Sequence, residues 1–376
     1  MSSPAHDVET RFVGLPSPTA RRAGAGGHPC QGLYWTPKGK PKPRVAVIAN
    51  HYNVDFAEHY IAPYFAARGI GFLGWNTRYR GAEDQFILEH GLVDISVGVK
   101  WLREVAGAEV VVLVGNSGGG SLMAAYQAEA QVSTLAATAE GALKDALLAA
   151  PKADLYISLN AHPGRPEVLT AYLDASVTDE TDPVATDQSL NPFNPDNGPP
   201  FSADFIAKYR AGQRARNQRI TDYCKTELAR LNAVGIPDRI FPLFRMWADL
   251  RFLDPAIDPS DRPCPACYPG NPAVANRSPL GLGRANTLRS WLSMWSLETS
   301  KCRGDVQLGK IHLPALVVQS TADTGVFLSD AHQIFNALPE GDKTLEFLPG
   351  AHYFEDSTAH RDRVADLMTA WIEKRS

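Results

Sequence analysis

A serine stands at the centre of the stretch that most constrains how this chain can fold. The β-branched and aliphatic run at residues 110–114 leads into Gly115-Asn116-Ser117-Gly118-Gly119, and small, helix-forming residues follow. This order predicts a strand, a sharp turn and a helix, with Ser117 at the apex of the turn. Glycine at both ends of the motif avoids Cβ atoms where the strand and the helix approach each other. The pattern predicts that Ser117 is a catalytic nucleophile, because a serine hydroxyl needs exposure and an adjacent base to attack a substrate.

Two later segments supply a candidate acid and a candidate base. Residues 314–319 predict a buried strand that ends just before Asp323, and residues 343–348 predict another that ends just before His352. Open α/β sheets place their functional groups beyond the carboxyl ends of the strands. The chain order Ser117, Asp323, His352 therefore predicts a nucleophile, acid and base that meet at one edge of a sheet.

These motifs and their order resemble the α/β-hydrolase superfamily, at both ends of the chain. Residues 44–50 look like the third strand of that family, and His51-Tyr52-Asn53 stands where many members have His-Gly-x. The resemblance implies an oxyanion hole made by the backbone N–H of Gly118 and that of either Tyr52 or Asn53. It also implies that His51 supports this loop through hydrogen bonds.

The resemblance implies an α/β-hydrolase fold, with a mostly parallel central sheet flanked by helices and an inserted cap. The domains expected on this basis are a first core segment at residues 1–160, a cap or lid at 161–310, and a second core segment at 311–376 with the acid and the histidine. Residues 1–27 are expected to be flexible or to lie across the cap, whereas residues 11–37 are expected to form the opening β-hairpins. A non-core segment as long as the cap is usually functional.

Candidate substrate-binding residues come from predicted strand ends and from the insertion. His51, Asn116 and His162 lie at or just after the ends of predicted strands, which places them near the mouth of the site. Trp291 and Trp295 are one helical turn apart. They are expected to line an aromatic or acyl pocket, and packing of the cap against the core explains them at least as well.

Composition points to neither a cofactor nor a macromolecular partner. A net charge of −4 over 376 residues gives no reason to expect binding to nucleic acid or to an anionic membrane. The sequence contains no run of about 18 apolar residues, which a membrane-spanning helix would need, and its first residues do not resemble a signal peptide. We therefore expect a cytoplasmic protein. Cys264 and Cys267 form one Cys-x-x-Cys in a proline-rich loop that lacks the further ligands of a zinc site. We expect free thiols there and no metal, with a local disulfide as the alternative.

The sequence thus predicts a serine hydrolase that cleaves a carboxylic ester of a small or medium-sized organic substrate, through an acyl-enzyme on Ser117 and without a cofactor. The same residues would also serve lactone, thioester, amide or C–C bond hydrolysis, or acyl transfer. A non-catalytic binding protein on the same scaffold is the alternative from another class. A dinucleotide-binding turn is disfavoured because the Gly-x-Gly-x-x-Gly spacing is not met. Nothing in the sequence indicates an oligomeric state.

Overall fold

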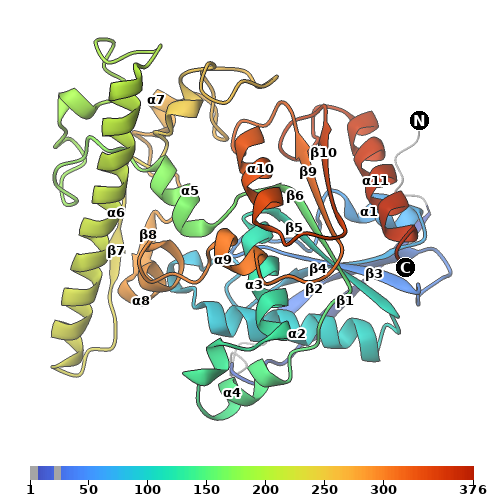
Figure 1. The fold of residues 1–376 in the computed structure, drawn as a ribbon. Helices are drawn as coiled ribbons and strands as arrows, with labels where there is room; N and C mark the ends of the chain where they lie inside the picture. The colour runs from blue at the N-terminus through green and yellow to red at the C-terminus, as the bar shows by residue number, and fades with distance from the viewer. Residues whose placement is uncertain (1–6, 21–26) are drawn as a thin grey trace.

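An eight-stranded sheet forms the centre of the molecule (Figure 1). The computed structural model describes residues 7–20 and 27–376 of the chain. From one edge to the other, the strands are β1 (Val8–Leu15), β2 (Cys30–Pro37), β4 (Gly71–Asn76), β3 (Val45–Asn50), β5 (Val110–Ser117), β6 (Leu155–Ala161), β9 (Ala315–Ser320) and β10 (Lys343–Leu348). β2 is antiparallel to both of its neighbours, and all the other pairs are parallel. The predicted mostly parallel sheet is confirmed.

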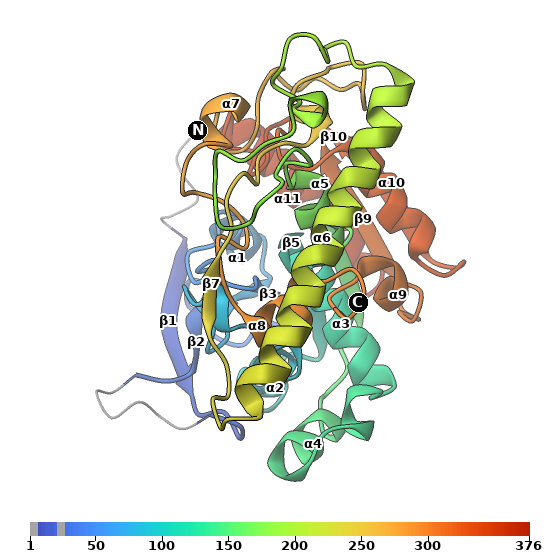
Figure 2. The same ribbon diagram turned by 90° about the vertical axis from the view of Figure 1, so that its left-hand side faces the viewer.

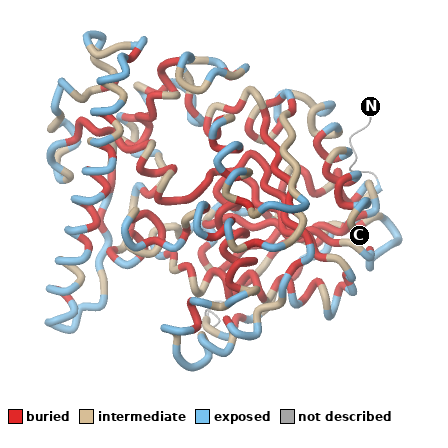
Figure 3. Tube along the Cα trace, viewed as in Figure 1, coloured by how far each residue is buried: buried red, intermediate tan, exposed pale blue. Residues whose placement is uncertain are grey.

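Helices cover both faces of this sheet. The helices α1 (Ala62–Ala67) and α11 (Thr358–Glu373) pack on one face. The other face carries five helices, α2 (Leu88–Glu104), α3 (Gly119–Gln131), α4 (Gly141–Leu148), α9 (Gly304–Leu308) and α10 (Leu328–Ala337). Two short helical turns, η2 (Glu83–Gln85) and η3 (Leu135–Ala137), precede α2 and α4 in the chain. The central strands are buried along most of their length (Figure 3). Burial on both faces explains why these strands read as continuous apolar runs and not as alternating patterns.

The N-terminal strand corrects one expectation. Residues 8–15 form β1, which pairs antiparallel with β2 along its whole length, so they are neither flexible nor laid across the cap as was expected of residues 1–27. This pairing agrees with the hairpin expected at residues 11–37. β1 is an edge strand with largely exposed side chains, so backbone hydrogen bonds hold it in place more than a buried face does. Residues 1–6 and 21–26 lie outside the described part of the chain.

A long insertion connects β6 to β9 and lies beside the sheet (Figures 1 and 2). Besides α9, it contains α5 (Arg165–Tyr172), η4 (Gln188–Leu190), α6 (Ala203–Asn232), β7 (Ile240–Pro242), η5 (Leu250–Phe252), α7 (Pro272–Ala275), β8 (Ala285–Thr287), α8 (Leu288–Ser290) and η6 (Trp291–Trp295). β6 and β9 are neighbours in the sheet, so the chain leaves and re-enters the sheet at adjacent strands. The domain boundaries at residues 161 and 310 stay a prediction.

The helix α6 spans the whole insertion (Figure 2). It begins after Ser202, whose hydroxyl accepts a hydrogen bond from the backbone N–H of Phe205 at 3.2 Å. On its buried side, Asn217 Nδ2 donates to Thr170 Oγ1 in α5 and to the carbonyl of Trp295, both at 2.9 Å. These bonds tie α6 to the segments that approach the sheet. Among the described helices, none is both long enough and apolar enough to cross a bilayer.

Candidate active site

Ser117 occupies a strained turn between β5 and α3. Its φ is +56°, a left-handed conformation that non-glycine residues seldom adopt and that is common at functional sites. A Cβ on Gly115 would lie 2.5 Å from the Cα of Gly120, and one on Gly119 would lie 2.3 Å from the carbonyl oxygen of Asn50. The predicted clash between the strand and the helix of the motif is confirmed for Gly115, whereas Gly119 is required because α3 begins against the end of β3.

Asp323 and His352 meet in the structure. The Oδ2 of Asp323 lies 2.6 Å from the Nδ1 of His352, and both side chains are buried. The other carboxylate oxygen, Oδ1, accepts the backbone N–H groups of Gly325 at 2.7 Å and Val326 at 3.0 Å. The carboxylate is thus fixed from two sides, and a proton on Nδ1 leaves the Nε2 of His352 free to accept one.

Asn160 links the two loops that carry these residues. Its Nδ2 donates to the carbonyl of His352, and its Oδ1 accepts the backbone N–H of Ser320, each at 2.7 Å. Asn160 is fully buried and has a φ of +42° at the end of β6. One side chain therefore fixes the end of β9, three residues before Asp323, relative to the loop after β10.

A cavity of about 460 Å³ brings Ser117 and His352 together. His51, His162 and Arg165 also line it. Its other walls carry six aromatic side chains, Phe56, Tyr60, Tyr172, Trp247, Tyr268 and Tyr353, together with the charged residues Asp55, Glu58, Glu355 and Arg361. In the described part of the chain no hydrogen bond joins Ser117 Oγ to His352, and such bonds are often long before a substrate binds.

The loop after β3 discriminates between the two candidate oxyanion donors. The Nδ1 of His51 accepts the backbone N–H of Asn53 at 3.3 Å and that of Val54 at 3.2 Å, so the Asn53 N–H is engaged. In the described residues, the backbone N–H groups of Tyr52 and Gly118 donate no hydrogen bond. The geometry therefore favours Tyr52 over Asn53 as the partner of Gly118.

Tyr52 replaces the glycine of the family pattern without strain. Its backbone is not in the left-handed region, and its side chain is fully buried, with the phenol oxygen 3.1 Å from Ser121 Oγ. The aromatic ring lies 4.5 Å from the guanidinium carbon of Arg165. The ring thus packs into the core and forms part of the wall behind the candidate oxyanion hole.

The two predicted cavity histidines are electrically neutral near pH 7. Burial lowers the pKa of both His51 and His162 well below the ordinary value, and the positive charge of Arg165 lowers it further. The backbone N–H of His162 donates to the carbonyl of Ser117 at 3.1 Å. His162 therefore supports the turn from the neighbouring strand while its ring faces the cavity.

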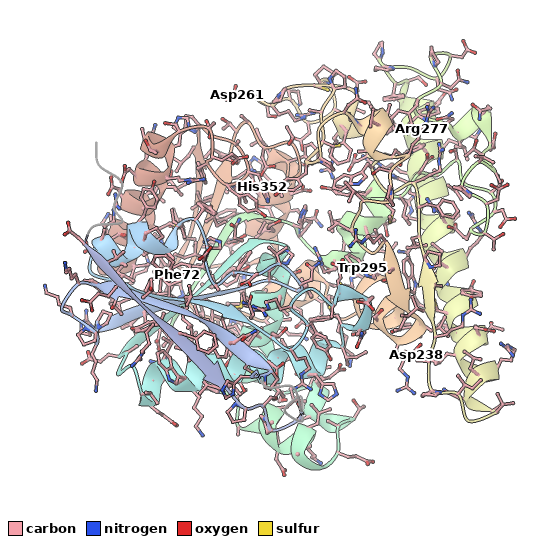
Figure 4. All side chains as sticks on the ribbon, turned by 180° about the vertical axis from the view of Figure 1, so that it is seen from behind. Phe72, Asp238, Asp261, Arg277, Trp295 and His352 are labelled. Atoms are coloured by element: carbon pink, nitrogen blue, oxygen red, sulfur yellow. The ribbon has the colours of Figure 1, made fainter. Side chains whose placement is uncertain are left out.

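Three other predicted binding residues are placed in the protein interior. Asn116 is fully buried, its Oδ1 accepts a hydrogen bond from His59 Nε2 at 3.0 Å, and its Nδ2 donates to the carbonyl of Leu159 at 2.7 Å. Trp291 and Trp295 are also fully buried, and none of the three is among the described residues that line the cavity (Figure 4 labels Trp295). The structure thus gives no support to direct substrate contact by Asn116, Trp291 or Trp295, because all three side chains are packed in the interior, and those of Asn116 and Trp291 are also hydrogen-bonded there.

The sequence reasoning missed two residues that the structure places at the site. Asn160 and Arg165 follow one another closely at the end of β6, but no motif or spacing marks either one. The only available signal was their position beyond the carboxyl end of a strand that neighbours the serine-bearing strand.

Solved structures share the arrangement of sheet and helices. The α/β hydrolase GrgF from Penicillium sp. sh18 matches with a TM-score of 0.51 and 12% sequence identity, over 96% of this chain and 98% of that chain. The chain has the α/β-hydrolase fold. Two further structures with lower scores are Est1E from Butyrivibrio proteoclasticus (TM-score 0.49, 11% identity, 92% and 94% coverage) and DcsB in complex with its substrate analogue (0.49, 14%, 98% and 99%). No family model and no curated protein matches the sequence. The likeness concerns the α/β-hydrolase fold alone, so function has to be argued from the site.

Proposed function

We propose that the protein is a serine hydrolase that cleaves a carboxylic ester of a small or medium-sized organic substrate. The observation that carries the proposal is the contact of Asp323 Oδ2 with His352 Nδ1 in the wall of the cavity where Ser117 is held in a left-handed conformation. A nucleophile, a base and an acid that orients the base are what acyl transfer needs. The cavity volume of about 460 Å³ and the aromatic walls suit a substrate of this size.

The proposed reaction proceeds through an acyl-enzyme. His352 Nε2 accepts the hydroxyl proton of Ser117 as Oγ attacks the carbonyl carbon, and the carbonyl electron pair moves onto the oxygen. The backbone N–H groups of Gly118 and Tyr52 bind this oxyanion. The electron pair returns from the oxyanion to the carbonyl, and the alcohol leaves with the proton from His352. His352 then deprotonates a water molecule, which attacks the acyl carbonyl. The carboxylic acid is released as Ser117 Oγ takes the proton back from His352. Asp323 keeps the imidazole in the required tautomer throughout.

Hydrolysis of a p-nitrophenyl ester series by the wild type and by Ser117→Ala tests the proposal, with a fluorophosphonate probe alongside. We expect turnover and labelling in the wild type and neither in Ser117→Ala. Ser133→Ala is the matched control, because the Ser133 hydroxyl is buried, has no hydrogen-bond partner in the described residues and lies away from the cavity. It should retain both activities.

The pattern of outcomes separates the alternatives. Labelling of Ser117 without ester turnover would point to other acyl chemistry on the same residues, such as thioester, amide, lactone or C–C bond cleavage, or acyl transfer. Absence of labelling in a folded wild-type protein would refute the hydrolase and support a binding protein on this scaffold.

A further inference from the structure

A buried arginine stands beside the candidate oxyanion hole. Arg165 is 1% exposed, opens α5 directly after β6, and lines the cavity that contains Ser117. Its Nη2 donates to Glu83 Oε1 at 2.5 Å. The guanidinium carbon lies 4.5 Å from the ring centre of Tyr52 and 4.7 Å from that of Trp295. The carboxylate compensates the charge and the rings fix the orientation, so the guanidinium is held in one place before any substrate arrives.

One edge of this guanidinium has no protein partner. In the described part of the chain, Nη1 of Arg165 donates to no acceptor, and it is not fully buried as the unpaired Nε is, so it is accessible from the cavity that Arg165 lines. A Cβ built on Gly118 would lie 2.5 Å from this Nη1 atom. The free N–H groups are therefore next to the residue whose backbone N–H is a candidate oxyanion donor.

A second side-chain donor converges on the same point. The same Cβ position on Gly118 lies 2.7 Å from Nε2 of His51. Because Nδ1 of His51 accepts two backbone N–H groups, the proton of the neutral ring belongs on Nε2. Burial and the charge of Arg165 lower the pKa of His51, so the ring stays in this neutral form at pH 7.

We propose that Arg165 Nη1 and His51 Nε2 are side-chain donors of the oxyanion hole, which act together with the backbone N–H groups of Gly118 and Tyr52. This inference rests on the proposed hydrolase function. As Ser117 Oγ bonds to the carbonyl carbon and its proton passes to His352, the carbonyl electron pair becomes localised on the oxygen. The fixed cation and the fixed N–H dipole stabilise that negative charge, which disappears when the electron pair returns to the carbonyl and the alcohol leaves.

The alternative role of Arg165, as an anchor for a substrate carboxylate, fits the geometry less well. Carboxylates favour two parallel N–H donors from one edge of a guanidinium. Here Nη2 faces Glu83, and Nε is buried without access to the cavity, which leaves Nη1 alone. A single donor beside Gly118 suits a single oxygen, and the neutral His51 would add little to the binding of a full charge.

Two variants test the proposal independently. Arg165→Met removes the cation, and His51→Asn keeps an acceptor for the loop N–H groups while it removes the Nε2 donor. We expect each to lower kcat by about 100-fold with little change in KM, on both p-nitrophenyl butyrate and the charged p-nitrophenyl hemisuccinate. Affinity for a boronic acid, which forms a tetrahedral adduct on Ser117, should fall by the same factor as kcat/KM. Arg230→Met, at an exposed site on α6, is the matched control and should leave both values unchanged.

The outcomes separate this inference from the proposed function on which it rests. Folded wild-type protein with neither ester turnover nor fluorophosphonate labelling would refute the hydrolase and this role of Arg165 together. Normal kcat in both folded variants, with normal wild-type turnover, would overturn the inference alone. A loss confined to the hemisuccinate and expressed in KM would overturn it in favour of a carboxylate anchor. Thermal unfolding identifies a misfolded variant, and His51→Asn, which leaves the Glu83 ion pair intact, then decides the question.

Discussion

Substitution of Asn160 should uncouple the two loops that carry the proposed acid and base. Among the described residues, only the Asn160 side chain bonds both the last residue of β9, Ser320, and the carbonyl of His352. Asn160→Gly removes both bonds and introduces no backbone strain, because glycine accepts a φ of +42°. The variant therefore isolates the contribution of the amide group.

The expected loss of stability comes from the two groups left behind. The backbone N–H of Ser320 and the carbonyl of His352 would be buried and unpaired, at about 1–3 kcal/mol each. The greater freedom of glycine in the unfolded chain adds about 0.5–1 kcal/mol. Together these terms predict a decrease of about 2.5–7 kcal/mol in the free energy of unfolding. Displacement of the imidazole by about 1 Å would lower kcat by about 100-fold.

Urea unfolding and ester hydrolysis measure the two effects. Asn232→Gly is the matched control, because Asn232 is exposed at the end of α6, and it should lose less than about 1 kcal/mol and keep its activity. A loss below about 1 kcal/mol in Asn160→Gly, with kcat unchanged, would show that the loops hold their positions without this side chain, and our reasoning would be wrong.

Two further predictions concern stability. Burial raises the pKa of Glu167 from 4.5 to about 7, so the folded state binds this proton more tightly than the unfolded chain does. The free energy of unfolding should therefore fall by up to about 3 kcal/mol as the pH rises from 4.5 to 7. Urea unfolding of Glu167→Gln should lack this part of the pH dependence, and an identical pH dependence in both proteins would contradict the prediction. Gly120→Ala should lower the free energy of unfolding by about 1–3 kcal/mol and slow the labelling of Ser117, because the new Cβ would lie 2.5 Å from the Cβ of Ala161. A second change, Ala161→Gly, should restore both the stability and the labelling rate. If thermal unfolding shows no recovery in the double variant, the clash is not the cause.

Local patterns in the sequence predicted the fold and the three candidate triad residues. Each of Ser117, Asp323 and His352 comes at the end of a recognisable apolar strand or within a few residues of it, so short windows were enough to place them at one sheet edge. The strand β1 was harder to predict because its exposed edge position gives no apolar alternation.

The supporting residues could not be found in this way because their partners are distant in the chain. Asn160 bonds a carbonyl 192 positions away, and Arg165 pairs with a carboxylate 82 positions away. Trp291 and Trp295 show a different difficulty, since an aromatic pair at helical spacing looks the same in sequence whether it lines a cavity or fills a core, and both explanations stayed open at that point. Only the folded arrangement distinguishes these cases.

The adjacency of β6 and β9 has a consequence for how this protein can change over evolution. Because the chain leaves the sheet after one strand and returns in the strand beside it, the insertion's length and contents are not tied to the hydrogen-bond register of the sheet. Residues can be gained, lost or exchanged there while Ser117, Asp323 and His352 keep their places. Asn160 at the end of β6 and Arg165 at the start of α5 precede most of the insertion, so its later segments can be exchanged without changing the sheet edge that carries Ser117, Asp323 and His352.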